Sequence, residues 1–247
     1  MEEGKANVRA VDRALDILLC FTTGTNLAMT EIAEKVGLHK STVHRMLATL
    51  EDKGFVERDS ASDRYHLGIR VWELSAHLSR TDDPGIIWQP EMERLRDKLG
   101  ETVSIYVRDG MERIRIQAVQ SNQPVRRVAP VGARLPLYAG ASSKVLIAYA
   151  DRDVQKQITG NPIWPAAIDR EHYKSQLEEI VGQGYATSFE EREPGVAALS
   201  APIFNRNGNL VAALSLSGPS SRLTLELMSE YAPSVIESAR RMGTMLR

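Results

Sequence analysis

One short stretch of the sequence gathers hydrogen-bond donors of several kinds. Within six residues it holds two cations, two hydroxyls and an imidazole: Lys40, Ser41, Thr42, His44 and Arg45. Apolar residues recur among them at three- and four-residue spacing: Val43, Met46, Leu47 and Leu50. This spacing predicts a helix over about 39–52 with one buried face. The major groove of DNA admits a helix whose inward side offers donors to base edges and phosphates, and the polar side of this helix has that chemistry.

Two further helices are expected to precede and position this stretch. An amphipathic helix is predicted over 7–21, with an apolar stripe of Val8, Val11, Leu15 and Leu18. Thr30 is predicted to cap a second helix over 30–36, which Gly37 ends. In a DNA-reading arrangement the Thr30 hydroxyl or N–H would face a phosphate, because a helix N-terminus attracts anions.

A hairpin is predicted directly after these helices. Strand-like residues at 55–58 and 65–67 flank a polar turn. Arg58 and Arg64 on this hairpin would reach phosphates or the neighbouring minor groove. Three helices followed by a hairpin is the order of a winged helix-turn-helix.

Composition limits the classes of protein that fit. The chain has 247 residues, with 31 basic and 32 acidic groups, so any contact with nucleic acid must come from a local patch. Aromatic residues make up 6%, which argues against a binder that stacks single-stranded bases. The single cysteine, Cys20, cannot form an internal disulfide or a zinc ribbon, and a packed core thiol is the simplest interpretation of it.

The second half of the chain changes to a mixed α and β pattern. A helix over 69–79 bearing Trp72 and Leu78 is followed by the clearest linker, at 81–85. Beyond it the patterns predict helices at 88–99, 142–150, 170–182 and 225–245, and strands at 102–108, 114–118, 196–204 and 210–217. Antiparallel strands with helices outside them give an α+β domain.

Several motifs in collinear order carry a family resemblance. In the first half they are Val8 to Leu18, Glu31-Ile32-Ala33, Gly37-Leu38, Lys40 to Leu47, Gly54-Phe55-Val56 and Tyr65-His66-Leu67-Gly68. In the second half they are Gly132 to Leu137, Ser143 to Leu146, Glu190-Glu191, Pro194-Gly195-Val196, Ser200 to Phe204 and Ala213 to Pro219. Together they resemble the IclR family of bacterial transcriptional regulators over essentially the whole chain.

The resemblance implies an architecture and a function. It implies a winged helix-turn-helix at 1–68, a linker helix at 69–84 and a GAF-like effector-binding domain at 85–247. The expected function is sequence-specific binding of double-stranded operator DNA by a repressor of a catabolic operon. A small carboxylated metabolite, an organic or aromatic acid, would modulate it. The resemblance also implies a homodimer, often assembled further into a tetramer, and the linker helix is expected to pack against the second copy.

Effector-binding positions carried over from the family fall on six residues: Ala141, Ser142, Glu190, Ala198, Ser215 and Ser217. Ser215 and Ser217 alternate along a predicted strand, so both hydroxyls share one face. Ala198 stands where a cysteine occurs in some relatives and Glu190 where an aspartate occurs, so the identity of the effector does not carry over. One of Arg126 and Arg127 would offer a countercharge, since neighbours on a strand point to opposite faces.

Two other classes of function remain open on the residues alone. One is a catalytic GAF-type domain with an accessory helix-turn-helix, and the other is a protein-interaction adaptor. No HExxH, SxxK or glycine-rich phosphate motif occurs, and the five histidines are scattered. We therefore expect no catalysis, no cofactor and no metal site. No apolar run is long enough to span a membrane, and we expect a cytoplasmic protein.

Overall fold

The computed structural model describes residues 8–78, 84–126, 130–166 and 168–246. The chain divides into two compact units, Met1–Thr81 and Asp82–Arg247. The predicted linker at 81–85 falls at this division, and its residues 81–83 lie outside the described part of the chain. Each unit is considered by itself.

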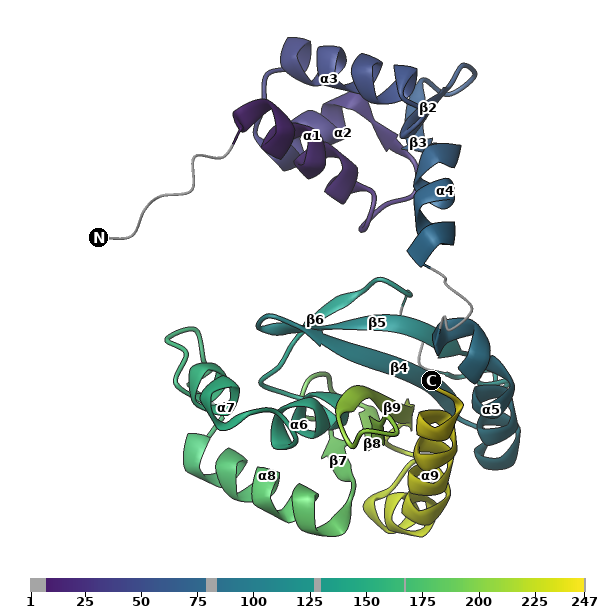
Figure 1. The fold of residues 1–247 in the computed structure, drawn as a ribbon, viewed down its shortest axis with the longest axis vertical. Coiled ribbons are helices and arrows are strands. Elements are labelled where there is room, and N and C mark those ends of the chain that lie inside the picture. The colour runs from purple at the N-terminus through teal and green to yellow at the C-terminus, as the bar shows by residue number, and fades with distance from the viewer. Residues whose placement is uncertain (1–7, 79–83, 127–129, 167, 247) are drawn as a thin grey trace. The chain divides into compact units, whose positions relative to one another are not determined.

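The first unit contains the predicted helices and hairpin (Figure 1). Its elements are α1 (Arg9–Cys20), β1 (Leu27–Ala28), α2 (Met29–Val36), α3 (Lys40–Asp52), β2 (Val56–Asp59), β3 (Arg64–Leu67) and α4 (Ile69–Leu78). The two-residue strand β1 was not predicted. It pairs antiparallel with β3, giving a sheet of order β1-β3-β2.

The core of this unit corrects the predicted inner face of α1. Ile17 and Cys20 are buried beside residues of the other helices, among them Ile32, Val43 and Leu47. The predicted apolar stripe instead lies mostly outside: Val8, Val11 and Leu15 are 65%, 53% and 52% exposed, and Leu18 is half-buried. Helix α1 is therefore apolar on two faces, and the small core covers only one of them.

The start of α2 also differs from the prediction. The residue that precedes the helix is Ala28, and Thr30 lies exposed in the first turn rather than at the cap. The Glu31 carboxylate accepts the Ala28 N–H at 2.7 Å, so an acidic side chain of the first turn satisfies the N–H of the residue that precedes the helix. Gly37 ends the helix with a φ of 63°, in the left-handed region that favours glycine.

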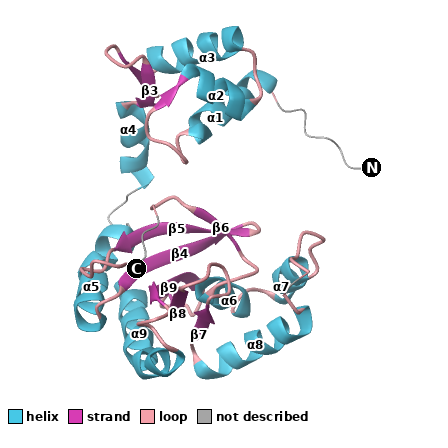
Figure 2. Ribbon diagram, turned by 180° about the vertical axis from the view of Figure 1, so that it is seen from behind, coloured by secondary structure: helices cyan, strands magenta, loops and turns pink. Residues whose placement is uncertain are grey.

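The second unit is a six-stranded antiparallel sheet with helices on both faces (Figures 1 and 2). The strand order is β6-β5-β4-β9-β8-β7. Its strands are β4 (Thr102–Asp109), β5 (Glu112–Val119), β6 (Arg134–Pro136), β7 (Ala186–Phe189), β8 (Val196–Phe204) and β9 (Leu210–Pro219). Its helices are α5 (Pro84–Leu99), α6 (Ala141–Ala148), α7 (Arg152–Thr159), α8 (Arg170–Gln183) and α9 (Leu225–Met245). Three short elements, β6, β7 and α7, had not been predicted.

The two faces of this sheet carry different residues. One face packs against α5 and α9 and is wholly apolar where it is buried, with Val103, Leu199 and Leu214 at its centre. The other lies under α6 and α8 and carries buried serines at the same depth. Ser215 on β9 pairs in register with Ser104 on β4 and with Ser200 on β8, so these serines form a row across the sheet. The second face therefore carries polar side chains in the interior of the fold.

Candidate functional site

Helix α3 presents the donor-rich stretch to solvent. Val43, Leu47 and Leu50 are buried beneath it, which turns Lys40, His44 and Arg45 outward. These three side chains make no hydrogen bond or ion pair within the described part of the chain. Cations that have no internal partner keep their full capacity to bind phosphates or base edges.

The two predicted hydroxyls of this stretch are placed differently. Ser41 is exposed, and its hydroxyl lies 2.7 Å from Nδ1 of His39, the residue that caps α3. The same Nδ1 accepts the Ser41 N–H at 3.3 Å. Thr42 is half-buried. The N-terminus of α3 is therefore held by its own cap, and Lys40, His44 and Arg45 are its unoccupied donors.

The hairpin arginines are engaged inside the first unit. Arg58 Nε donates to the Asp63 carboxylate at 2.5 Å, which raises the pKa of the guanidinium, and the cation also lies 5.9 Å from the Tyr65 ring centre. Arg64 pairs with Glu31 at 2.6 Å and donates to the Asn26 carbonyl. The contacts of Arg58 lie within the hairpin, and the ion pair of Arg64 joins the hairpin to α2, so both arginines already have partners.

A small cavity in the second unit lies between the sheet and the start of α6. Its volume is about 40 Å³. Five of the six positions carried over from the family line it: Ala141, Ser142, Ala198, Ser215 and Ser217. They come from a helix and two neighbouring strands that the topology brings together.

Glu190 is placed away from this cavity. Its backbone has a φ of 56°, and its exposed carboxylate accepts the Ser220 hydroxyl at 2.6 Å. The next residue reaches the start of α6 instead: Glu191 accepts the Gly140 N–H at 3.1 Å and forms an ion pair with the buried Lys144. With the left-handed φ at Glu190, the Glu190 carboxylate is exposed and the Glu191 carboxylate contacts the start of α6.

Two buried arginines on β5 line the cavity, and sequence reasoning had missed them. Arg113 and Arg115 are 3% and 2% exposed. Both guanidinium groups lie near the Tyr106 ring, 5.5 and 5.1 Å from its centre, and Arg115 Nε donates to the Tyr106 hydroxyl at 2.9 Å. Arg113 Nη1 donates to three acceptors: the carbonyl oxygens of Pro136 and Ala139, at 2.5 and 2.9 Å, and the Ser143 hydroxyl.

Burial changes the electrostatics of Arg113. The loss of hydration, together with the nearby cations Arg192 and Arg115, lowers the pKa of its guanidinium to about 10. A cation in this position is stabilised by carbonyl dipoles, and an anion entering the cavity would stabilise it more.

The missed signal lies in the alternation of β5. Ile114, Ile116 and Ala118 alternate with polar residues, and this pattern predicts one buried side and leaves the arginines facing solvent. Because helices cover both faces of the sheet, both sets point into the fold. The countercharge had been sought at Arg126 and Arg127. Arg126 is exposed and donates to Gln120 Oε1 and the Gln123 carbonyl, and Arg127 lies outside the described residues.

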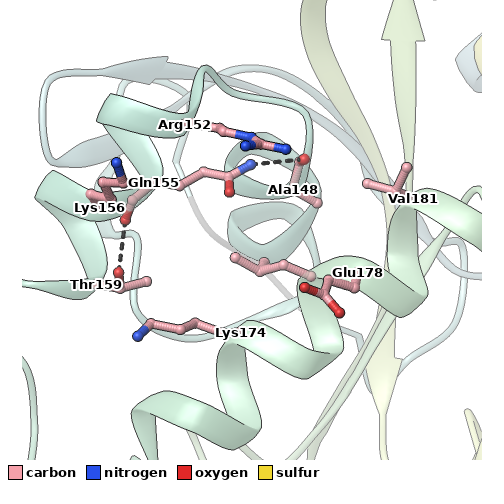
Figure 3. A pocket seen from close by; sticks show the side chains of 9 residues that line it. Ala148, Arg152, Gln155, Lys156, Thr159, Lys174, Glu178 and Val181 are labelled. Carbon is pink, nitrogen blue, oxygen red and sulfur yellow. Dashed lines mark hydrogen bonds between the residues drawn. The ribbon is translucent and has the colours of Figure 1, made fainter.

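A wider groove of about 460 Å³ opens between α7 and α8 (Figure 3). Arg152 and Lys156 point into it from α7, and Lys174 and Glu178 from α8. Gln155 closes its upper side with a hydrogen bond to the Ala148 carbonyl at 3.1 Å. None of the six carried-over positions lines this groove.

Both units match profiles of one protein family. Residues 10–60 match the IclR helix-turn-helix domain, and residues 84–244 match the profile described as bacterial transcriptional regulator IclR C-terminal. The chain belongs to the IclR family. The predicted family and fold class are confirmed, and the chain is a bacterial transcriptional regulator with an N-terminal DNA-binding domain.

Relatives of this IclR-family chain include named regulators. The HTH-type transcriptional regulator BhcR of Paracoccus denitrificans is 31% identical, with 98% of this chain and 88% of BhcR covered. The HTH-type transcriptional repressor AllR of Escherichia coli K12 is 32% identical, with 96% of this chain and 90% of AllR covered.

A solved IclR homologue from Microbacterium hydrocarbonoxydans, complexed with 4-hydroxybenzoate, has the same fold. Its TM-score is 0.83 at 24% identity, with 95% of this chain and 98% of that chain covered. Within the described residues of the present IclR-family chain, no helix is both long and apolar enough to cross a membrane.

Proposed function

We propose that Lys40, His44 and Arg45 on α3 are the residues that read operator DNA. The observation that carries this proposal is their lack of any partner within the described part of the first unit, combined with their exposure on the side opposite a buried apolar face. Arg58 and Arg64 act chiefly by bracing the hairpin, because acids of the same unit already hold them.

The test is a comparison of two arginine variants. An operator is first obtained by selection from randomised duplexes, and binding is measured by gel shift at fixed salt. Arg45→Ala is expected to cost about 1–3 kcal/mol of operator affinity with the fold intact. Arg108→Ala removes an exposed arginine of β4 in the second unit and is expected to cost nothing. Equal operator affinities for the two variants would show that Arg45 does not contact the DNA.

The first unit also offers a surface for a second copy of the chain. On α1 the exposed apolar stripe consists of Val8, Val11, Leu15 and Leu19, and α4 adds Ile69, Trp72 and Leu74. The side chain of Leu78, expected to share that surface, lies outside the described residues. Trp72 is 67% exposed, which is unusual for so large an apolar side chain in a chain that acts alone. A dimer also brings two recognition helices to two half-sites, which one short helix needs for specificity.

Dimerisation is tested by placing a charge on the α1 stripe. Leu15→Glu is expected to shift the chain from dimer towards monomer in sedimentation velocity and to weaken operator binding. Val181→Glu, a matched change at an exposed apolar residue of α8, serves as the control. The same measurement resolves a dimer from a dimer of dimers, and a monomeric wild type would contradict the proposal.

The cavity under α6 is proposed as the effector site. Its support is the convergence of five carried-over positions with two buried arginines. The Microbacterium homologue, which holds 4-hydroxybenzoate, is an example of an IclR-fold protein that takes an organic acid. An effector acts by binding the DNA-competent and DNA-incompetent arrangements with different affinity, so operator must weaken effector binding by the same factor. Ser215→Leu fills the cavity and is expected to abolish the effector response.

The proposed physiological role is repression of a catabolic operon in the bacterial cytoplasm, without catalysis. The relative AllR is named a repressor, which supports repression rather than activation. A target on chromosomal DNA supports a location in the cytoplasm. A reporter fused to the selected operator is expected to rise when the gene for this chain is deleted. A fall in the reporter would identify an activator.

A further inference from the structure

Two polar atoms in the wall of the cavity have no partner. They are Nε of Arg113 on β5 and Oγ of Ser217 on β9, and both are buried. Within the described residues neither makes a hydrogen bond. Buried polar groups in native proteins nearly always have partners, and an unmade bond costs free energy. Since β4 separates β5 from β9, the two atoms come from strands that lie two places apart in the sheet.

The charge of the lining favours an anion. Its ionisable side chains, apart from Tyr106, comprise three arginines and one glutamate: Arg113, Arg115, Arg192 and Glu193. Burial already lowers the pKa of the Arg113 guanidinium, so the site stabilises a cation poorly on its own. A ligand with two negative charges would balance the two positive charges that the lining holds in excess.

The size of the cavity limits the ligand further. With a volume of about 40 Å³ the cavity is narrow, so its ligand must be thin. Gly140 at the start of the helix and Leu135 of β6 close the space. A short, unbranched ligand suits this shape better than an aromatic ring.

We propose that the effector is a short aliphatic dicarboxylate, with one carboxylate bound by Arg113 Nε and the other by the Ser217 hydroxyl. This inference rests on the proposed role of the cavity as the effector site, and it adds the class of ligand and a residue that determines specificity. Arg113 would supply a charged donor at one end of the ligand and Ser217 a neutral donor at the other. A ligand with only one carboxylate would therefore leave one of the two donors without a partner.

Calorimetric titration of the full chain tests the class of ligand directly. The probes are malonate and succinate, with acetate as a monocarboxylate and 4-hydroxybenzoate as an aromatic acid, all at the same ionic strength. Malonate or succinate is expected to bind at least ten-fold more tightly than acetate or 4-hydroxybenzoate. If neither diacid binds, or if acetate binds as well as they do, the assignment is overturned.

Matched variants test the residues. Ser217 and Ser104 lie on the same face of the sheet, and each has a buried hydroxyl without a hydrogen-bond partner. Only Ser217 lines the cavity, so Ser104→Ala is the matched control for Ser217→Ala. Ser217→Ala is expected to weaken diacid binding about five-fold or more, whereas Ser104→Ala leaves it unchanged. Arg113→Lys keeps the charge and removes the Nε donor, and it is expected to weaken binding about ten-fold. Equal affinities for the two serine variants would overturn the role of Ser217, whether or not the lysine variant folds.

The outcome separates this inference from the effector site on which it rests. If 4-hydroxybenzoate releases operator DNA and Ser215→Leu abolishes that release, the cavity is the effector site and the dicarboxylate class is wrong. If malonate releases DNA equally from wild type and Ser215→Leu, the cavity is not the effector site, and both proposals fail.

Discussion

Arg45 on α3 and Arg113 on β5 are both arginines that have no carboxylate partner within the described part of the chain, yet they stand in opposite surroundings. Arg45 is exposed to solvent. Arg113 is 3% exposed, and the carbonyl oxygens of Pro136 and Ala139 replace its water. An exposed cation costs little free energy of folding and attracts phosphates from a distance. A buried cation needs oriented dipoles to stabilise it and can bind only a ligand that enters its cavity.

The comparison predicts its largest effect in the dependence on salt. Between 50 and 200 mM salt, operator affinity is expected to fall about a hundred-fold or more, because each phosphate contact releases a counterion. Affinity for malonate is expected to change less than about three-fold, since buried charges are screened much less. Anisotropy titration and calorimetry at matched salt measure the two slopes. If the affinities for operator and for malonate depended equally on salt, the proposed difference between the exposed and the buried arginine would be wrong.

A substitution that keeps the charge sharpens the same contrast. Arg113→Lys is expected to lower the free energy of unfolding of the second unit by about 1–3 kcal/mol, because a lysine cannot serve every acceptor that the guanidinium holds. Arg45→Lys is expected to stay within about 0.5 kcal/mol of wild type, as surface substitutions usually do. Urea denaturation followed by circular dichroism measures both. A larger loss for Arg45→Lys would contradict the assignment of the exposed and buried roles.

The smallest expected effect concerns pH. The folded-state pKa of Arg113 is lowered to about 10, below that of a hydrated guanidinium. The ligand needs the protonated form, so affinity for malonate is expected to be flat up to pH 9. It should then fall about two-fold by pH 10, where half of the free protein has lost that proton. Calorimetry at pH 8, 9 and 10 provides the check. Affinity that rises over this range would show that Arg113 does not bind the acid.

Long periodic segments were predictable from the sequence because their burial pattern is set locally. Helix α3, strand β8 and helix α9 lie within a residue or so of the predicted bounds, since each has one apolar face of ordinary width. The short elements β1, β6, β7 and α7 were missed because tertiary pairing, rather than local pattern, stabilises segments of that length.

The errors at the candidate sites have similar physical causes. The stripe on α1 faces outward because a small core covers only one of two apolar faces. Glu190 lies outside the cavity, and its backbone adopts a left-handed φ that no local sequence pattern reveals. The burial of Arg113 was not predicted, because alternation along a strand identifies its two faces but not which of them is covered. In this sheet helices cover both faces.

The exposed donors of α3 that have no internal partner are the residues proposed to read DNA. Anisotropy titration of the selected operator with Arg45→Ala and Arg58→Ala, side by side at fixed salt, tests this proposal most directly. Arg58 is already paired with Asp63, so its loss is expected to cost less than half of what Arg45→Ala costs. An Arg58→Ala variant that loses as much operator affinity as Arg45→Ala, or more, would contradict the account.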